Sequence, residues 1–350
     1  MTPKDPPLRW SLAGEEAQTS LLDEEIDPTR ELREVEYLHV RSRSIISAVP
    51  ASSRMPFRHT INAYRGCSHA CTYCFARPTH AYLGLNGLED FERRIVVKIN
   101  AVERLAAELS RPNWLGEHIA MGTNTDPYQP CEGRYRLTRR IVETLAAARN
   151  PFSILTKSTM ILRDLDVLAA AAERTSVRVN LSIGTLDEQV WQLSEPGTPP
   201  PPRRVEAVAR LNAAGVRCGV LVAPILPGIS DGEDQLSAVV KACAEAGAVS
   251  ISSIGLHLRP GVRELFMPWL ARVRPDLVER YRTLYSARNG YLAADEQSRL
   301  AARVRRLVEQ HGGIPVGARS ARFDDGSHGA RRRRKAPPPP PDAVQLRLVG

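Results

Sequence analysis

The sequence predicts an α/β fold, a partial (β/α)6 barrel followed by a helical extension and a disordered basic, Pro-rich tail. From Thr60 onward, short β-branched apolar runs alternate with Ala- and Leu-rich helical stretches. This order is typical of parallel strands joined by right-handed crossovers. The chain has 350 residues and a hydrophobic fraction of 43%, enough to bury a large core.

The apolar runs predict six strands, at 60–64, 118–121, 152–156, 177–183, 218–226 and 249–256. The periodic stretches between them predict helices at 101–109, 137–148, 165–174, 204–214 and 232–246. We expect Asp164 to open the helix that begins at Leu165, and Asn150-Pro151, Gly215 and Gly247 to end helices. Additional helices are expected near 265–273 and 294–310, where they would close one end of the barrel or flank the substrate.

Four segments follow from this pattern. Residues 1–54 have no clean period and are expected to wrap the outside, residues 55–260 form the barrel core, and residues 261–318 form the helical extension. Residues 319–350 hold a basic block and a proline run and are expected to be disordered. No apolar run approaches the ~18 residues that span a bilayer, and the N-terminus has no signal-peptide pattern. We therefore expect a cytoplasmic protein without a membrane partner.

The formal net charge of +9 is concentrated at one end, because the block 331–335 supplies five of these charges. Clustered arginines exchange counterions for phosphates, which favours a nucleic-acid partner. A solubilising tail is an equally good interpretation of the same block.

Three cysteines, Cys67, Cys71 and Cys74, lie in the spacing C-x3-C-x2-C. Iron–sulfur clusters are usually held by four thiolates, so three leave one iron of a 4Fe–4S cluster open to a ligand that is not protein. A structural zinc site needs four N or S ligands, and no second Cys or His pair lies at ligand spacing. A disulfide framework needs an oxidising compartment. The spacing therefore favours the cluster, with these three cysteines as its metal ligands.

This stretch, with Tyr73 just before the third cysteine, resembles the signature of the radical SAM superfamily. The resemblance implies that the open iron chelates S-adenosylmethionine (SAM) through its amino and carboxylate groups. It implies reductive cleavage of SAM to a 5′-deoxyadenosyl radical, with an electron donor such as flavodoxin or ferredoxin.

Polar residues at the ends of the later predicted strands form a second group of candidates. The loop 122–130, with Asn124 and Asp126, is either a ligand-binding loop or a plain turn. Lys157 suggests an anionic partner, although a surface lysine is as well supported. Ser182 is either a ribose contact or a small core residue. Glu195, with Arg203 and Arg204 after it, forms either a ligand clamp or a surface ion pair.

Several segments in order resemble one branch of the superfamily, the spore photoproduct lyase-like or DNA repair photolyase-like proteins. They are 61–67, 74–77, 122–130, 156–158 with Arg163-Asp164, Glu195-Pro196 and 224–228. The resemblance covers roughly residues 40–290 and implies a partial TIM barrel. It implies SAM contacts from Tyr73, Asn124, Asp126, Lys157, Ser182 and Glu195.

The resemblance weakens where the substrate would bind. Spore photoproduct lyase returns a hydrogen atom through a cysteine, and at the matching place this chain has Thr123 and Asn124. Cys131 would substitute only if its loop folds inward, so repair of spore photoproduct is not expected. His257 and Arg259, after the sixth predicted strand, are candidates for the substrate side. No catalytic side chain is assigned.

We therefore predict a radical SAM enzyme that abstracts hydrogen from an unidentified substrate, which is either nucleic acid or an unrelated small molecule or protein. The alternative is a DNA-associated accessory protein with a structural or redox-sensing cluster. Residues 345–349 faintly resemble a peptide that binds bacterial sliding clamps, or form a final strand. A zinc-stabilised nucleic-acid-binding module is the third interpretation.

Overall fold

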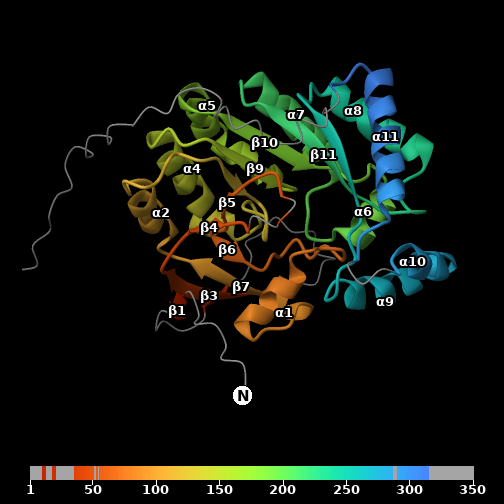
Figure 1. Ribbon diagram of the computed structural model, residues 1–350, viewed down its shortest axis with the longest axis horizontal. Coiled ribbons are helices and arrows are strands. Elements are labelled where there is room, and N and C mark those ends of the chain that lie inside the picture. Colours follow the sequence, from red (N-terminus) through yellow and green to blue (C-terminus); the bar gives the residue numbers. More distant parts are fainter. Residues whose placement is uncertain are drawn as a thin grey trace, which may run out of the picture.

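The computed structural model describes residues 10–12, 18–20, 35–50, 53, 55–286 and 290–314. Its main element is a seven-stranded sheet in which six parallel strands lie in chain order (Figure 1). These strands are β5 (His59–Ile61), β8 (Ile119–Met121), β9 (Phe152–Thr156), β10 (Val177–Ser182), β11 (Cys218–Ile225) and β12 (Ile251–Gly255). A short antiparallel strand, β4 (Ile46–Ala48), extends the β5 edge. The predicted α/β class and the six-unit partial barrel are confirmed.

Helices connect these strands and cover the outer face of the sheet (Figure 1). They are α2 (Ala101–Leu109), α3 (Glu132–Tyr135), α4 (Leu137–Ala147), α5 (Leu165–Arg174), α7 (Pro201–Ala213) and α8 (Glu233–Glu245). The short helix α6 (Glu188–Ser194) lies instead beside α9 (Arg263–Val273), where Trp269 Nε1 donates to the Leu193 carbonyl (Figure 1). The last helix, α11 (Ala294–Gln310), packs against β12 and α8 and so covers the final strand. Within the described ranges, no helix is both long and apolar enough to cross a membrane.

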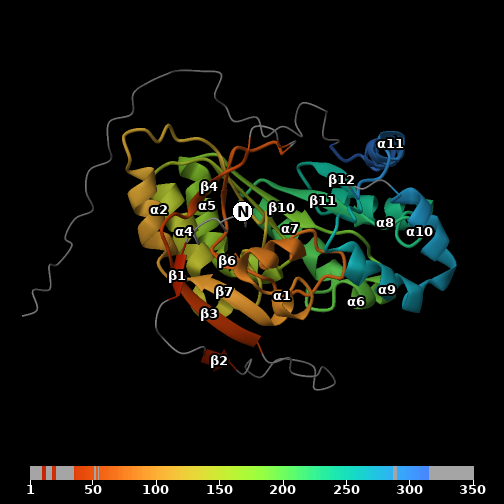
Figure 2. The same cartoon turned by 60° about the horizontal axis from the view of Figure 1, so that its bottom comes forward.

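A second, smaller sheet lies beside the main one, in the order β1-β3-β7-β6 with β2 paired to β3 (Figure 2). Its strands are β1 (Trp10–Leu12), β2 (Gln18–Ser20), β3 (Val35–Ser42), β6 (Tyr64–Arg65) and β7 (Arg94–Lys98). A helix of one turn, α1 (Glu89–Arg93), leads into β7. Neither β3 nor β7 was predicted, because their short apolar runs lie outside the repeating strand–helix pattern.

The predicted strand at 60–64 is wrong in one respect, because it spans two sheets. The chain leaves the main sheet after β5, and Lys98 holds the crossing by donating from Nζ to the carbonyl of Asn62 at 2.8 Å and from its backbone N–H to the carbonyl of Ala63 at 3.0 Å. It then continues as β6 on the second sheet. The cysteines therefore begin from a strand that both sheets position.

A helix begins at Leu165 as predicted, but the predicted cap is wrong, because the Asp164 side chain makes no capping hydrogen bond. A 3-10 turn, η2 (Thr159–Asp164), runs directly into α5, and the Ser158 hydroxyl caps that turn by accepting from the Met160 N–H at 3.2 Å. The fully buried Asp164 carboxylate instead accepts from the Arg163 guanidinium at 2.8 Å. The predicted glycine stops are confirmed, since Gly215 and Gly247 take φ of +79° and +72° just after α7 and α8.

The helices after β12 form a second apolar cluster beneath the cysteines. They are α9 (Arg263–Val273), the 3-10 turn η3 (Pro275–Leu277) and α10 (Val278–Leu284). Their buried side chains, among them Phe266 and Tyr281, pack in one cluster with Cys71 and Tyr73. The predicted helices near 265–273 and at 294–310 are confirmed, and the predicted tail at 319–350 lies outside the described residues.

Candidate functional site

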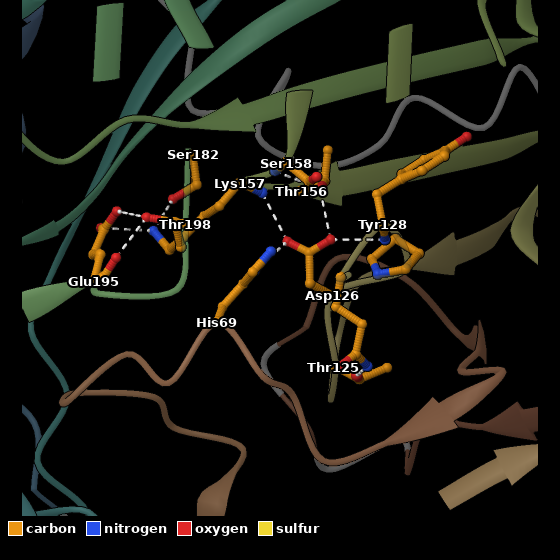
Figure 3. A network of polar contacts seen from close by, with 12 residues as sticks. His69, Thr125, Asp126, Tyr128, Thr156, Lys157, Ser158, Ser182, Glu195 and Thr198 are labelled. Carbon is orange, nitrogen blue, oxygen red and sulfur yellow. Dashed lines mark hydrogen bonds and ion pairs between the residues drawn. The ribbon is translucent and has the colours of Figure 1, made fainter. Parts of the chain in front are cut away.

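Parallel strands bring their carboxyl ends to one edge of the sheet, and the predicted residues lie there. The turn after β8 carries Asn124 and Asp126, Lys157 follows β9, and Ser182 ends β10. Glu195 follows α6, the helix after β10. Figure 3 shows the side chains of Asp126, Lys157, Ser182 and Glu195 in one connected polar network.

The first residue of the cysteine loop, which spans residues 66–76, fixes where the loop begins. Gly66 has φ of +81°, and a Cβ at this position would lie 2.8 Å from the carbonyl oxygen of Phe91. The Gly66 carbonyl accepts from Thr125 Oγ1 at 2.6 Å and from Gln129 Nε2 at 3.1 Å. The loop therefore begins on a backbone that favours glycine, tied to the turn after β8.

A second set of backbone bonds holds the middle of the cysteine loop. The Thr72 N–H donates to the carbonyl of Ser194 at 3.0 Å, and the Gly197 N–H donates to the carbonyl of His69 at 3.0 Å. A Cβ on Gly197 would lie 2.3 Å from the Ser68 carbonyl oxygen, so the segment after α6 approaches the loop as only glycine allows.

The thiols themselves are buried or nearly so. Burial raises the pKa of Cys67, and the charges of Asp126 and the two other cysteines raise it further, while a hydrogen bond from the Asp126 backbone N–H opposes them. Burial also raises the pKa of Cys74, opposed by a backbone hydrogen bond from Ala76 and by nearby cations. Thiols that must deprotonate to bind metal thus have N–H donors and cations around them.

Three cations act on the Cys74 thiol, those of Arg77, Lys157 and Arg259. Within the described residues, no three His, Cys, Asp or Glu side chains are placed to hold a single metal ion. In a 4Fe–4S cluster each cysteine binds a different iron. Three soft thiol donors on one braced loop, with N–H groups and cations facing them, fit such a cluster.

Glu195 is the centre of a buried ionic network formed by Tyr73, Lys157, Ser182, Glu195, Thr198 and Arg204, which we call the Glu195 network. Its carboxylate accepts from the Tyr73 hydroxyl, from Lys157 Nζ at 3.1 Å and from Arg204 Nη2 at 2.5 Å. Burial would raise the pKa of Glu195, but the charges of Arg204 and Lys157 and hydrogen bonds from Tyr73 and Arg204 lower it to about 2. Since Arg204 is 1% exposed, this pair is not a surface ion pair.

Lys157 has every donor of its ammonium engaged. Its Nζ donates to Ser182 Oγ at 2.7 Å, to Glu195 Oε1 at 3.1 Å and to the carbonyl of Ala223 at 3.2 Å. An ammonium has three N–H groups, so a ligand that binds Lys157 must replace one of these bonds.

Asp126 joins the cysteine loop to the end of β9. One carboxylate oxygen accepts from the Thr156 hydroxyl at 2.6 Å and the Tyr128 N–H at 2.9 Å, and the other accepts from the Lys157 N–H at 2.8 Å (Figure 3). The second oxygen also lies 3.4 Å from His69 Nδ1. Burial opposes ionisation of Asp126, but His69 and these hydrogen bonds lower its pKa.

The other predicted residues lie apart from these bonds. Among described residues, the Asn124 side chain makes no hydrogen bond, and only its backbone N–H is engaged, donating to Asn62 Oδ1 at 3.1 Å. Arg259 acts electrostatically on Cys74, and its Nε is buried without a hydrogen-bond partner. His257 stacks on Tyr291 with ring centroids 3.6 Å apart. Cys131 is 2% exposed and packs in the main apolar core, so its loop does not fold inward as a hydrogen donor there would require.

Sequence reasoning missed His69, Arg77, Gln129 and Thr198. Gln129 lies in the predicted loop at 122–130, and Arg77 belongs to a stretch already noticed for its resemblance. His69 lies between Cys67 and Cys71, and nothing in the local sequence indicates that it faces Asp126. The signal for Arg77 was its place three residues after Cys74, but spacing alone does not reveal that a guanidinium turns back onto its own loop.

The chain matches the model of the radical SAM superfamily over residues 61–238. It is 45% identical over 277 residues to the uncharacterized protein Rv2578c of Mycobacterium tuberculosis, which covers 79% of this chain and 81% of that protein. It is 30% identical over 176 residues to the uncharacterized protein MJ0683 of Methanocaldococcus jannaschii, covering 50% of this chain and 63% of that protein. The chain therefore belongs to the radical SAM superfamily.

Within that class, the fold is similar to solved structures of spore photoproduct lyase. One, complexed with dinucleoside spore photoproduct, has a TM-score of 0.60 and 20% sequence identity, covering 80% of this chain and 81% of that one. A mutant with bound AdoMet and dinucleoside spore photoproduct has a TM-score of 0.58 and 22% identity, covering 75% and 77%. At this identity the similarity shows a shared fold.

Proposed function

We propose that this protein is a radical SAM enzyme that holds a 4Fe–4S cluster on Cys67, Cys71 and Cys74. When bound, the cluster supplies the electron that cleaves SAM and yields a 5′-deoxyadenosyl radical for hydrogen abstraction. One observation carries the proposal: three thiols lie on a loop braced from several directions at the carboxyl edge of a six-stranded partial barrel. In such barrels this edge carries the active site.

The surrounding residues divide into ligand contacts and supports. The Asn124 amide is available to the amino acid part of SAM, and Lys157 offers charge to its carboxylate by exchanging its longest bond, the one to the Ala223 carbonyl. Ser182 supplies a hydroxyl for a ribose. Tyr73 and Glu195 hold Lys157 in place, and Asp126 holds the cysteine loop through His69.

For the substrate we propose nucleic acid. The lyase structures that share this fold hold a dinucleoside lesion, and the basic block at 331–335 favours phosphate contacts. Hydrogen return by a thiol is not proposed, since Cys131 is in the core. Deletion of 331–350 should lower DNA affinity at low salt and flatten its salt dependence; an unchanged salt slope would show that this segment does not bind phosphate.

A structural or redox-sensing cluster is the second candidate, and the completeness of the Glu195 network favours it. Lys157 and Glu195 satisfy each other without any ligand, as residues that only support a cluster would. In that case SAM is not turned over.

The experiment that separates these functions is anaerobic reconstitution, followed by dithionite and SAM, with 5′-deoxyadenosine measured by chromatography. An enzyme should form 5′-deoxyadenosine, and Cys71→Ala should abolish it while Cys131→Ala retains it. A protein that holds four-iron clusters yet forms no 5′-deoxyadenosine, with DNA present or absent, would contradict the enzyme and support the second candidate.

A further inference from the structure

Arg77 is a fully buried guanidinium whose five N–H groups are all used. It begins the 3-10 helix η1 (Arg77–Leu83), directly behind the third cysteine. Its Nε and Nη2 donate to the carbonyl oxygen of Cys71 at 3.1 and 3.0 Å. Its Nη1 donates to the carbonyls of Gly87 and Leu88 at 3.1 and 2.9 Å, and Nη2 also donates to Glu92.

A buried charge needs an electrostatic reason to be retained, because water solvates a cation better than carbonyl groups do. Glu92 compensates the charge of Arg77 only in part, since that carboxylate is 16% exposed while the Arg77 side chain is fully buried. The same Nη2, together with Nε, donates to the Cys71 carbonyl, so the guanidinium also lies against the backbone of the cysteine loop. The positive end of this ion pair is thus directed at the cysteine loop.

The other cations near the loop differ from Arg77 in their bonding. Lys157 is paired with Glu195, which is itself buried, and within the described residues Arg259 makes no hydrogen bond to the backbone of the cysteine loop. Arg77 alone, among these three in the described structure, is fixed by two hydrogen bonds to the carbonyl of a cysteine. Its charge therefore keeps a constant position relative to the thiols.

The potential of an iron–sulfur cluster depends on net charge, hydrogen bonding and solvent exposure around it. We propose that Arg77 is a positioning residue that sets the reduction potential of the cluster, its fixed buried charge favouring the reduced state, while its bonds to the Cys71 carbonyl hold the loop. This inference rests on the proposed function.

Three variants separate charge from support. Arg77→Gln removes the charge, Arg77→Lys keeps the charge but loses the forked bonds, and Glu92→Gln leaves the bonds from Arg77 to Cys71 and removes part of the compensation. The readout is an anaerobic redox titration of the reconstituted full-length protein, followed by electron paramagnetic resonance. Arg210→Gln, at an exposed position on α7, is the matched control.

At a fixed potential, Arg77→Gln should lower the ratio of reduced to oxidised cluster about tenfold, a shift of about 59 mV for one electron. Glu92→Gln should raise this ratio, Arg77→Lys should stay within about twofold of the natural protein, and Arg210→Gln should not change it. Equal shifts in Arg77→Lys and Arg77→Gln would overturn the proposal, because lost bonds would then explain both.

If Arg77→Gln fails to fold or to hold iron, Glu92→Gln still decides. An upward shift in that variant supports the proposal, and an unchanged potential overturns it. Failure of the proposed function is seen separately, before any titration begins. A natural protein without the cluster would lack four iron and four sulfide per chain, and one with the cluster but without SAM cleavage would form no 5′-deoxyadenosine.

Discussion

The cysteine loop and the Glu195 network lie side by side at one edge of the sheet, and they are completed in opposite ways. In the loop, the backbone is bonded to the turn after β8, to the end of α6 with the segment that follows it, and to Arg77. The three thiols are left facing N–H groups and cations. In the network, the buried carboxylate of Glu195 pairs with both Lys157 and Arg204.

The difference separates two kinds of preorganisation. The backbone of the cysteine loop is held by hydrogen bonds, whereas its three thiols are ligands for a metal. A cluster that arrives from outside would therefore complete the loop. The network is satisfied by itself, so a ligand must exchange contacts there. The loop can therefore lose its function without unfolding, whereas damage to the network should first appear as lost stability.

Replacing any one of Cys67, Cys71 or Cys74 by Ala should have the largest effect. Each variant should lose the brown colour and nearly all four-iron content after anaerobic reconstitution, because a cluster held by two thiolates is exposed to solvent and chelators. Iron and sulfide analysis measures this. Cys131→Ala is the matched control and should retain the cluster. Full iron content in two of the three loop variants would break the assignment.

Glu195→Ala should be the largest change in stability. It leaves Arg204 buried and unpaired, which costs about 3–5 kcal/mol in the free energy of unfolding. Urea denaturation of the metal-free protein measures it. Glu206→Ala removes an exposed carboxylate paired with Arg210 and should stay within about 0.5 kcal/mol. Comparable losses in both variants would show that the network is not a stabilising unit.

The same carboxylate predicts a pH dependence. The pKa of Glu195 is lowered to about 2 in the folded protein from its ordinary 4.5. Its contribution is therefore complete above pH 4.5 and is lost as the pH falls from 4.5 toward 2. The natural protein should lose stability more steeply over this window than Glu195→Ala does. Parallel curves for the two proteins would exclude this contribution.

Gly66→Ala should lower the free energy of unfolding by about 2–3 kcal/mol. It forces an alanine into a left-handed backbone conformation and places its Cβ 2.8 Å from the carbonyl oxygen of Phe91. Gly215→Ala shares a φ near +80° but has no atom within 4 Å, so it isolates the backbone cost of about 1 kcal/mol. Denaturation midpoints of the two variants measure the difference. No difference between them would mean that the entry to the cysteine loop relaxes freely.

Lys157→Ala should have the smallest effect, about a tenfold loss of SAM affinity or about 1.4 kcal/mol. One charged contact is removed from a ligand that keeps its others. Isothermal titration of the reconstituted protein measures it, with iron content unchanged. Lys241→Ala, an exposed lysine on α8, is the control. Unchanged affinity in Lys157→Ala would place SAM away from the Glu195 network.

The strands and helices of the repeating core were predictable because each is a continuous run with one period. The helix at 101–109 and the strand at 152–156 have the predicted bounds. The second sheet was not predictable, because about fifty residues separate β3 from β7 along the chain. The sequence of neither strand indicates that it pairs with the other. The chain passes from one sheet to the other within two residues, Asn62 and Ala63. So short a segment has no sequence pattern from which the crossing could be predicted.

For the site, the spacing of the cysteines and the polar ends of the strands predicted which residues gather. The side-chain contacts that these residues make could not be predicted in the same way. Pairing of Glu195 with a buried Arg204 depends on how deep the helix α7 lies, and the reach of Arg77 back to Cys71 depends on a 3-10 turn. Burial and three-dimensional reach decide such contacts, and neither is written in local sequence.

The bonds from Ser194 and Gly197 to the cysteine loop have a consequence for biosynthesis. The three cysteines leave the ribosome more than one hundred residues before Ser194 and Gly197, which bond to the cysteine loop at Thr72 and His69. At translation rates of about 5–20 residues per second, the loop waits at least several seconds for these contacts. A chain released before residue 194 would carry every cysteine of the site and lack two of the bonds that fix them.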